Sequence, residues 1–241
     1  DDSISNKPLA PPLHLATTYV RPAEGPYEST DSIYSRLDNP TRQLLEHEIG
    51  RLETNEKDAD VVTCCAFASG MMAVSAIVLA HKAPLHVLLP KDTYHGVPTV
   101  LTDVFSRFQV TVERVDMTNA SAIEKALSDL PKESDSIVWI ESPSNPMCDV
   151  IDIQATCEYV RRVSNKTTVV VDSTLATPVL TQPLVLGADF VMHSATKYLA
   201  GHSDALIGVV TASPWTAHGQ ELGKRLQEVQ VAVGGVASPL D

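Results

Sequence analysis

The feature that most constrains this chain is an alternation of short β-branched runs with helix-length segments, which begins near Asp60. Amphipathic stretches such as NASAIEKALSDL (119–130) and IQATCEYVRRVS (153–164) separate several of these runs. Because such alternation implies crossover connections, it predicts an α/β fold with a mostly parallel sheet flanked by helices on both faces. The runs with the composition of strands are HVLLP (86–90), VTVERVD (110–116), SIVWIES (136–142), TTVVVDS (167–173), ADFVMHS (188–194) and ALIGVVTAS (205–213).

Residues 1–58 have a different character. They are polar, they carry prolines at positions 8, 11, 12, 22, 26 and 40, and they end in the helical pattern TRQLLEHEIGRLE (41–53). We therefore predict an extended N-terminal arm and a first helix over 1–58, followed by a single α/β domain over 59–241.

Composition excludes several kinds of partner. The net charge of -12, from 18 Lys and Arg against 30 Asp and Glu, provides no basic field for nucleic acid. No apolar stretch reaches the roughly 20 residues of a membrane span, and the start DDSISNKPLAPP has no signal-peptide core. Cys64, Cys65, Cys148 and Cys157 lack the paired spacing of a zinc site. We expect a cytoplasmic protein with free thiols, no bound metal, and neither nucleic acid nor membrane as a partner.

Polar clusters follow three of the predicted strands directly. SIVWIES runs into Pro143–Pro146, TTVVVD ends in Asp172–Thr174, and FVMHS runs into Ser194–Lys197. In open α/β sheets the carboxyl ends of the strands form the ligand site. We therefore expect the three clusters to open onto one rim.

Lys197 and Asp172 are the charged residues of this rim. A desolvated lysine amine is suited to Schiff-base chemistry, although an isolated lysine at a turn is more often a surface residue. The hydroxyls of Ser194 and Thr196 suit a phosphate group. Asp172 ends so apolar a strand that its carboxylate needs a partner. A helix cap or an ion pair would serve, but a pyridinium nitrogen is the partner that fits a neighbouring Schiff base.

Three further segments can contact a flat, phosphorylated ligand. In ASGMMAVSAIVLA (68–80), Gly70 permits close backbone approach before a helix N-terminus that attracts anions, although Ser-Gly is also an ordinary helix cap. The chain has no P-loop and no G-x-G-x-x-G after a strand, so a nucleotide phosphate is not favoured. Tyr94 can stack on a ring or cap the core. Asn145 can donate to a ring oxygen or form a turn.

These segments resemble the Cys/Met-metabolism family of pyridoxal-phosphate enzymes. That family includes cystathionine γ-synthase, cystathionine γ- and β-lyases, methionine γ-lyase and the O-acylhomoserine sulfhydrylases. The resemblance implies the aspartate-aminotransferase-like fold, fold type I, with pyridoxal 5'-phosphate bound by domain 59–241. The motifs that carry it are YSRLDNPT (34–41), ASGMMAV (68–74), DTYHG (92–96), ESPSNP (141–146), VVVDST (169–174) and HSATKYLAGHSD (193–204).

The resemblance also implies a role for each candidate residue. Lys197 would bind the cofactor covalently, Asp172 would keep its ring nitrogen protonated, and Tyr94 would stack on the ring and take part in proton transfer. Asn145 would contact a ring oxygen. The phosphate would be held by Gly70, Met71, Ser194 and Thr196. Tyr34 and Arg36 would reach the phosphate of a neighbouring subunit, which makes the arm an intersubunit element of a dimer or a dimer of dimers, the homotetramer.

The reaction implied is β- or γ-elimination or replacement on a small amino-acid substrate of transsulfuration, in methionine biosynthesis or cysteine metabolism. YSRLDNPT with YHG favours a cystathionine γ-synthase-like γ-replacement. A cystathionine γ- or β-lyase, a methionine γ-lyase, a sulfhydrylase and a truncated non-catalytic paralogue stay open. His95 and Val97 stand where the family more often has Gly and Thr. The sequence stops at GGVASPLD (234–241), so we expect the C-terminal substrate domain and its carboxylate-binding arginine to be missing.

Overall fold

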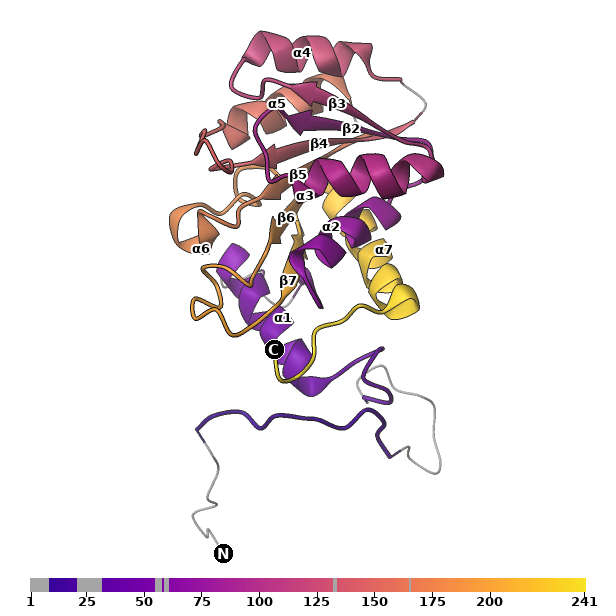
Figure 1. Cartoon of the computed structure of the whole chain (residues 1–241), viewed down its shortest axis with the longest axis vertical. Coiled ribbons are helices and arrows are strands. Elements are labelled where there is room, and N and C mark those ends of the chain that lie inside the picture. The colour runs from indigo at the N-terminus through magenta and orange to yellow at the C-terminus, as the bar shows by residue number, and fades with distance from the viewer. Residues whose placement is uncertain (1–8, 21–31, 55–57, 59–60, 132–133, 165) are drawn as a thin grey trace, which may run out of the picture.

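The computed structural model describes residues 9–20, 32–54, 58, 61–131, 134–164 and 166–241. In this part of the chain one sheet of seven strands, in the order β1-β7-β6-β5-β4-β2-β3, has helices against both faces (Figure 1). The predicted α/β class is confirmed. The strands are β1 (Thr63–Phe67), β2 (Leu85–Pro90), β3 (Val110–Val115), β4 (Asp135–Glu141), β5 (Thr167–Asp172), β6 (Phe190–His193) and β7 (Gly208–Ala212).

The sheet is parallel from β3 through β2, β4 and β5 to β6, as the alternation predicts. It turns antiparallel at β7 and again at β1. The chain returns from β6 to β7 through the helix-free loop 194–207, so the crossover that a parallel pair requires is not formed. β1 was missed by the sequence patterns because its Cys-Cys-Ala centre lacks the β-branched residues typical of strands, and its pairing with β7 decides its conformation.

Side-chain caps set the start of most helices. Asn39, Ser69, Asn119, Asp152 and Thr216 each accept a hydrogen bond from a first-turn N–H group. None of the described helices is both long and apolar enough to span a bilayer. The helices are α1 (Pro40–Glu53), α2 (Gly70–Leu79), α3 (Gly96–Thr99), α4 (Ala120–Asp129), α5 (Ile153–Val163), α6 (Thr177–Leu180) and α7 (Ala217–Val233).

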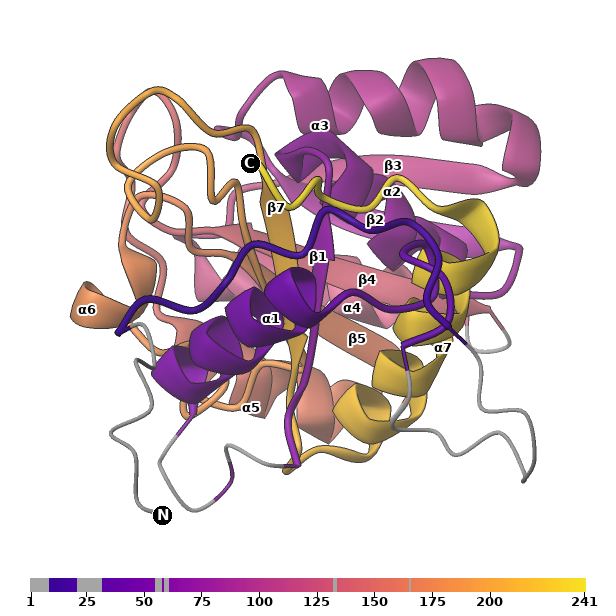
Figure 2. The same ribbon diagram turned by 90° about the horizontal axis from the view of Figure 1, so that it is seen from below.

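Alternation of side chains along the strands divides the core into two layers. Trp139 and Val170 face α2, α3 and α7, whereas Val138 and Val169 face α4 and α5. α1 covers the sheet at β1 and β7, where Ile49 is buried (Figure 2). The same alternation decides to which side each strand-end residue points.

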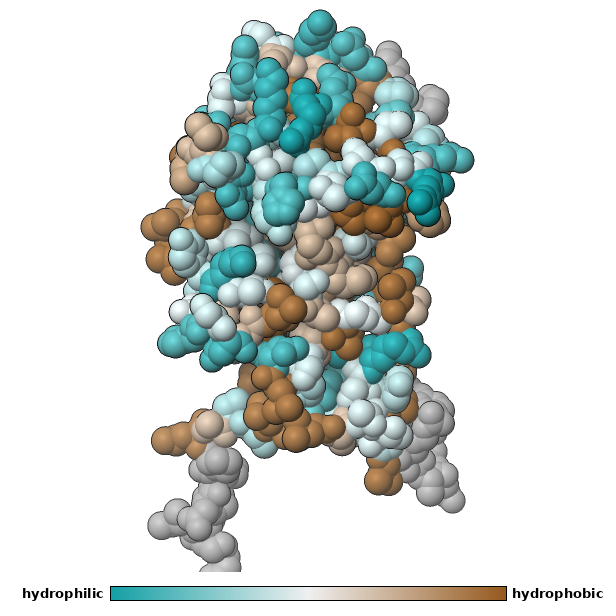
Figure 3. Space-filling model, in the orientation of Figure 1, coloured by the Kyte–Doolittle hydropathy of each residue, from teal (hydrophilic) through white to brown (hydrophobic). Residues whose placement is uncertain are grey.

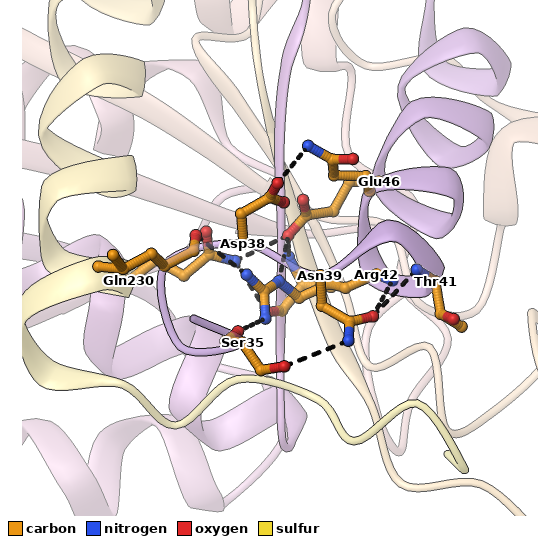
Figure 4. A network of polar contacts seen from close by, with 10 residues as sticks. Ser35, Asp38, Asn39, Thr41, Arg42, Glu46 and Gln230 are labelled. Atoms are coloured by element: carbon orange, nitrogen blue, oxygen red, sulfur yellow. Dashed lines mark hydrogen bonds and ion pairs between the residues drawn. The ribbon is translucent and has the colours of Figure 1, made fainter. Parts of the chain in front are cut away.

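A polar network fixes the N-terminal end of α1 (Figure 4). Arg42 is 5% exposed and donates to the carbonyl oxygens of Ser35, at 2.7 Å, and Leu37, at 3.1 Å. Glu46 accepts the backbone N–H of Ala66 in β1 at 2.7 Å. Burial raises the pKa of Glu46, and this hydrogen bond acts against the rise. The network therefore ties the turn before α1 to the sheet.

Gly208 provides a test of how closely β7 packs against the segment before α2. A Cβ atom there would lie 2.2 Å from the carbonyl oxygen of Ser69 and 2.8 Å from Cα of Gly70. Because these are backbone atoms that cannot rotate away, we expect Gly208→Ala to lower the free energy of unfolding by about 1–3 kcal/mol in urea denaturation. Gly223→Ala in α7 is the matched control, since its nearest contact is Cβ of Ala212 at 3.0 Å and alanine favours a helix. Equal losses in the two variants would contradict the prediction.

Candidate active site

A cavity of about 760 Å³ opens at the carboxyl ends of β4, β5 and β6, beside the start of α2. Its volume lies within the range of roughly 300–1,000 Å³ usual for small-molecule sites. Residues from all three predicted polar clusters line it, so these segments do meet at one rim. The predicted site residues that line it are Gly70, Met71, Tyr94, Asn145, Asp172, Ser194, Thr196 and Lys197.

Lys197 lies in the loop that follows β6, and its backbone N–H donates to the carbonyl of Ser194 at 3.0 Å. Its side chain lines the cavity but is exposed. In the chain by itself this side chain is therefore open to solvent. The neighbouring Tyr198 and Leu206, which also line the cavity, are 66% and 56% exposed. The described residues leave this wall of the cavity uncovered.

The N-terminus of α2 meets Ser194 at one end of the cavity. Ser69 caps the helix by accepting the N–H of Met72 at 3.1 Å, and the other first-turn N–H groups of a helix have no partner within it. A Cβ atom on Gly70 would lie 3.0 Å from Oγ of Ser194, so glycine allows this close approach. The result is a cradle suited to an anion.

Thr196 takes part in this end of the cavity in a different way from the prediction. Its hydroxyl donates to the carbonyl of Ile207 at 3.1 Å and accepts the N–H of Ile207 at 3.0 Å. The side chain therefore closes the loop between β6 and β7. Its predicted contact with a phosphate stays a prediction.

Asp172 is 6% exposed at the end of β5. Its Oδ1 accepts the backbone N–H of Thr174 at 3.0 Å and the hydroxyl of Thr174 at 2.5 Å, and Oγ1 of Thr174 accepts the N–H of Ser194 at 2.8 Å. Burial raises the pKa of Asp172, while the two bonds from Thr174, and then the nearby imidazole of His193, lower it. No described residue donates to Oδ2 of this carboxylate, which suits a cation bound in the cavity.

Glu141 is a site residue that the sequence patterns missed, although SIVWIES ends in Glu-Ser much as TTVVVDS ends in Asp-Ser. It is 4% exposed, lines the cavity and is the register neighbour of Asp172. Its oxygens accept the N–H groups of Tyr94 and Asn145, both at 2.8 Å, and the hydroxyl of Thr93. Burial raises the pKa of Glu141 to about 7, and the charge of Asp172 adds to the rise. The three hydrogen bonds lower the pKa and offset part of this effect.

Tyr94 is partly exposed and its ring forms part of the cavity wall. A Cβ atom on Gly96 would lie 2.5 Å from Cε1 of this ring, so the ring position depends on glycine there. The His95 ring lies 4.6 Å from the Tyr94 ring, centroid to centroid, at an angle of 58°. The departure from the family pattern at His95 is therefore in direct contact with the predicted stacking residue.

Tyr34 and Arg36 are not among the residues that line this cavity. Arg36 donates through Nη1 to the carbonyl of Val231 in α7, and its guanidinium lies 5.5 Å from the centroid of the Tyr34 ring. Arg36 also lines a second cavity of about 300 Å³, beside residues 234–239. The predicted contact of both residues with a neighbouring subunit's cofactor stays a prediction.

An anion cradle, a buried carboxylate and a lysine at one rim of an α/β sheet define the class of site, and known proteins place it in a family. Residues 1–241 match the family described as "Cys/Met metabolism PLP-dependent enzyme". The chain is 38% identical over 231 residues to cystathionine gamma-lyase of Bacillus subtilis, covering 95% of this chain and 56% of the relative. It is 37% identical over 237 residues to cystathionine gamma-synthase of Haemophilus influenzae, covering 97% and 58%.

A solved structure supports the same family. Cystathionine gamma synthase from Xanthomonas oryzae pv. oryzae, in complex with aminoacrylate and cysteine, superposes with a TM-score of 0.85 at 30% identity, covering 99% of this chain and 57% of that chain. The chain belongs to the Cys/Met-metabolism family of pyridoxal-phosphate-dependent enzymes. The predicted family, cofactor and type I fold are confirmed. The chain spans about half the length of the curated relatives it matches.

Thr174 offers a sharp test of how the site is held together. Thr174→Val keeps the volume of the side chain but removes the hydroxyl between Asp172 and Ser194. We expect it to lower the free energy of unfolding by about 1–3 kcal/mol, because a buried donor loses its partner, and to weaken pyridoxal-phosphate binding. Thr174→Ser retains the hydroxyl and serves as the control. Denaturation and cofactor titration that give equal values for the two variants would contradict this role.

Proposed function

We propose that this chain is the cofactor-binding part of a cytoplasmic enzyme of sulfur amino-acid metabolism that catalyses γ-replacement on a small amino acid, as a cystathionine γ-synthase does. The observation that carries the proposal is the single cavity shared by Lys197, Asp172 and the N-terminus of α2. Pyridoxal phosphate supplies an electron sink for negative charge at the substrate Cα when it is bound. The free thiols of Cys64, Cys65, Cys148 and Cys157 suit a reducing compartment.

Each residue of the cavity then has a defined task. Ser194 and the backbone at Gly70 and Met71 bind the phosphate, with Thr196 holding the loop beside them. Oδ2 of Asp172 keeps the proton on the ring nitrogen. The amine of Lys197 would hold the cofactor covalently in the absence of substrate, and once released it would be available to move the proton at the substrate Cα. Tyr94 covers the ring, and Asn145 contacts a ring oxygen.

A cystathionine lyase is the second candidate, because the lyase and synthase relatives are 38% and 37% identical to this chain. Product analysis separates the candidates. Supplied with an activated homoserine ester and cysteine, a γ-synthase joins them into a thioether. A lyase instead cleaves that thioether and releases ammonia. The assay uses the chain extended by the part that its relatives have and this sequence lacks. If that protein binds the cofactor but shows neither activity, the result would favour the non-catalytic paralogue and sink the γ-replacement proposal.

Lys197→Ala should abolish covalent attachment of pyridoxal phosphate but leave non-covalent binding, because other residues hold the phosphate and the ring nitrogen. After borohydride reduction, peptide mass spectrometry should find the cofactor on the Lys197 peptide of the unchanged chain and on no peptide of the variant. Lys91→Ala, which changes an exposed lysine that does not line the cavity, should keep the label. A label on any other lysine of the unchanged chain would overturn the assignment.

We further propose that the chain self-associates as a dimer or a dimer of dimers, with the arm against a neighbouring subunit. Leu9, Leu13, Leu15 and Val20 are all exposed, with Leu9 and Val20 almost completely so. Hydrophobic side chains also gather at the lower end of the body in Figure 3. A second copy that covers this end would bury these side chains. The Arg36 of one chain would then reach the cavity of the other, where its guanidinium suits a phosphate.

Mixing two variants tests this arrangement. Arg36→Ala chains and Lys197→Ala chains should each bind the cofactor weakly or without a covalent link. A hybrid dimer holds one site with both residues intact, so tight covalent binding should return when subunits exchange. Arg51→Ala, which removes an exposed arginine that pairs with Glu48 at 3.6 Å, is the control for loss of charge in the first helix. Confirmed exchange by native mass spectrometry without recovered binding would show that Arg36 acts within its own chain.

A further inference from the structure

We propose that Glu141 is a positioning residue of the cofactor site. It fixes the two segments that carry Tyr94 and Asn145, and together with Asp172 it forms a carboxylate pair that favours a ring with a positively charged nitrogen. The proposal rests on the proposed function. It assigns a role to a residue that lines the cavity and holds the segments of two predicted cofactor-binding residues.

The hydrogen bonds of Glu141 join two segments that are far apart in sequence. Oε2 accepts the N–H of Tyr94 at 2.8 Å and the hydroxyl of Thr93, from the segment after β2. Oε1 accepts the N–H of Asn145 at 2.8 Å, from the segment after β4. An ionised carboxylate is purely an acceptor, so it satisfies all three donors. A glutamine of the same shape would present its NH₂ group to one of them.

A second carboxylate joins the same two segments outside the cavity. Asp92 accepts the hydroxyl of Ser144 and the N–H of Met147, the latter at 3.0 Å, yet it does not line the cavity. Asp92 and Glu141 therefore differ in one respect that matters. Both hold the segments, but of the two only Glu141 lines the cavity.

Glu141 and Asp172 form a like-charged pair at the strand ends. They are register partners on the neighbouring parallel strands β4 and β5, which lie about 4.8 Å apart in any sheet, and their side chains share one face. Both are buried, and the charge of Asp172 opposes ionisation of Glu141. His193 points to the other face of the sheet, where it bonds Glu53, and Lys197 is exposed to solvent. A protonated ring nitrogen beside Asp172 therefore relieves the repulsion, whereas an uncharged ring does not.

Two ligands separate the charge effect from the positioning effect. The full chain is titrated with pyridoxal phosphate and with the analogue whose ring nitrogen is replaced by CH, and binding is followed by fluorescence. We expect Glu141→Gln to reduce the preference for pyridoxal phosphate over the analogue by about tenfold. Asp92→Asn should weaken the binding of both ligands equally and leave the preference for pyridoxal phosphate over the analogue unchanged. An unchanged preference in Glu141→Gln would overturn the charge role.

Amide hydrogen exchange of the cofactor-free chain tests the positioning role. Peptides covering 92–96 and 142–147 should exchange faster in Glu141→Gln than in the unchanged chain, while the peptide covering β7 keeps its rate. Glu141→Asp retains the charge on a shorter side chain. It should therefore keep the ligand preference, while its peptides 92–96 and 142–147 exchange faster than those of the unchanged chain. This variant also tests the positioning role if Glu141→Gln does not fold. Unchanged exchange in both variants would overturn positioning. If the unchanged chain binds neither ligand, the proposed function fails, and exchange still decides whether Glu141 holds the two segments.

Discussion

Burial of the Asp172 carboxylate is the constraint around which this end of the sheet is organised. Removing a carboxylate from water costs several kcal/mol unless its oxygens are bonded. Thr174 supplies two of those bonds, and its hydroxyl also accepts the N–H of Ser194. Ser194 in turn lies against Gly70 at the start of α2. One bonding requirement on β5 therefore positions the end of β6 and, through it, the anion cradle.

On the opposite face of the sheet, a separate set of contacts holds α1 in place. His193 follows the alternation of β6 away from the cavity, and its Nε2 lies 2.5 Å from Glu53 at the end of α1, with both side chains buried. At the other end of α1, Arg42 and Glu46 hold the preceding turn. α1 is therefore anchored at both ends, and the turn before it places Arg36 against the carbonyl of Val231 in α7.

Much of this site follows from sequence because the carboxyl ends of parallel strands meet at one edge. Asp172 and Ser194 each come at the end of a run of buried residues, and Lys197 follows three residues later, so little knowledge of loops is needed to predict that they converge. Glu141 obeys the same rule, but its importance comes from donors that reach it from another strand's loop. The strand at Cys64 depends on pairing with β7, a non-local contact. The exposure of Lys197 depends on which surfaces cover the cavity, and local sequence does not encode that.

Groups of opposite electrostatic character line the cavity, and this restricts the ligand more than its volume does. The N-terminus of α2 offers the positive end of its helix dipole, beside the hydroxyl of Ser194. The ends of β4 and β5 offer the carboxylates of Glu141 and Asp172. A nucleotide brings phosphate to the first group but no cation to the second. A phosphorylated ring with a protonated nitrogen would satisfy both groups at once, so the charges that select such a ligand would also orient it in the cavity.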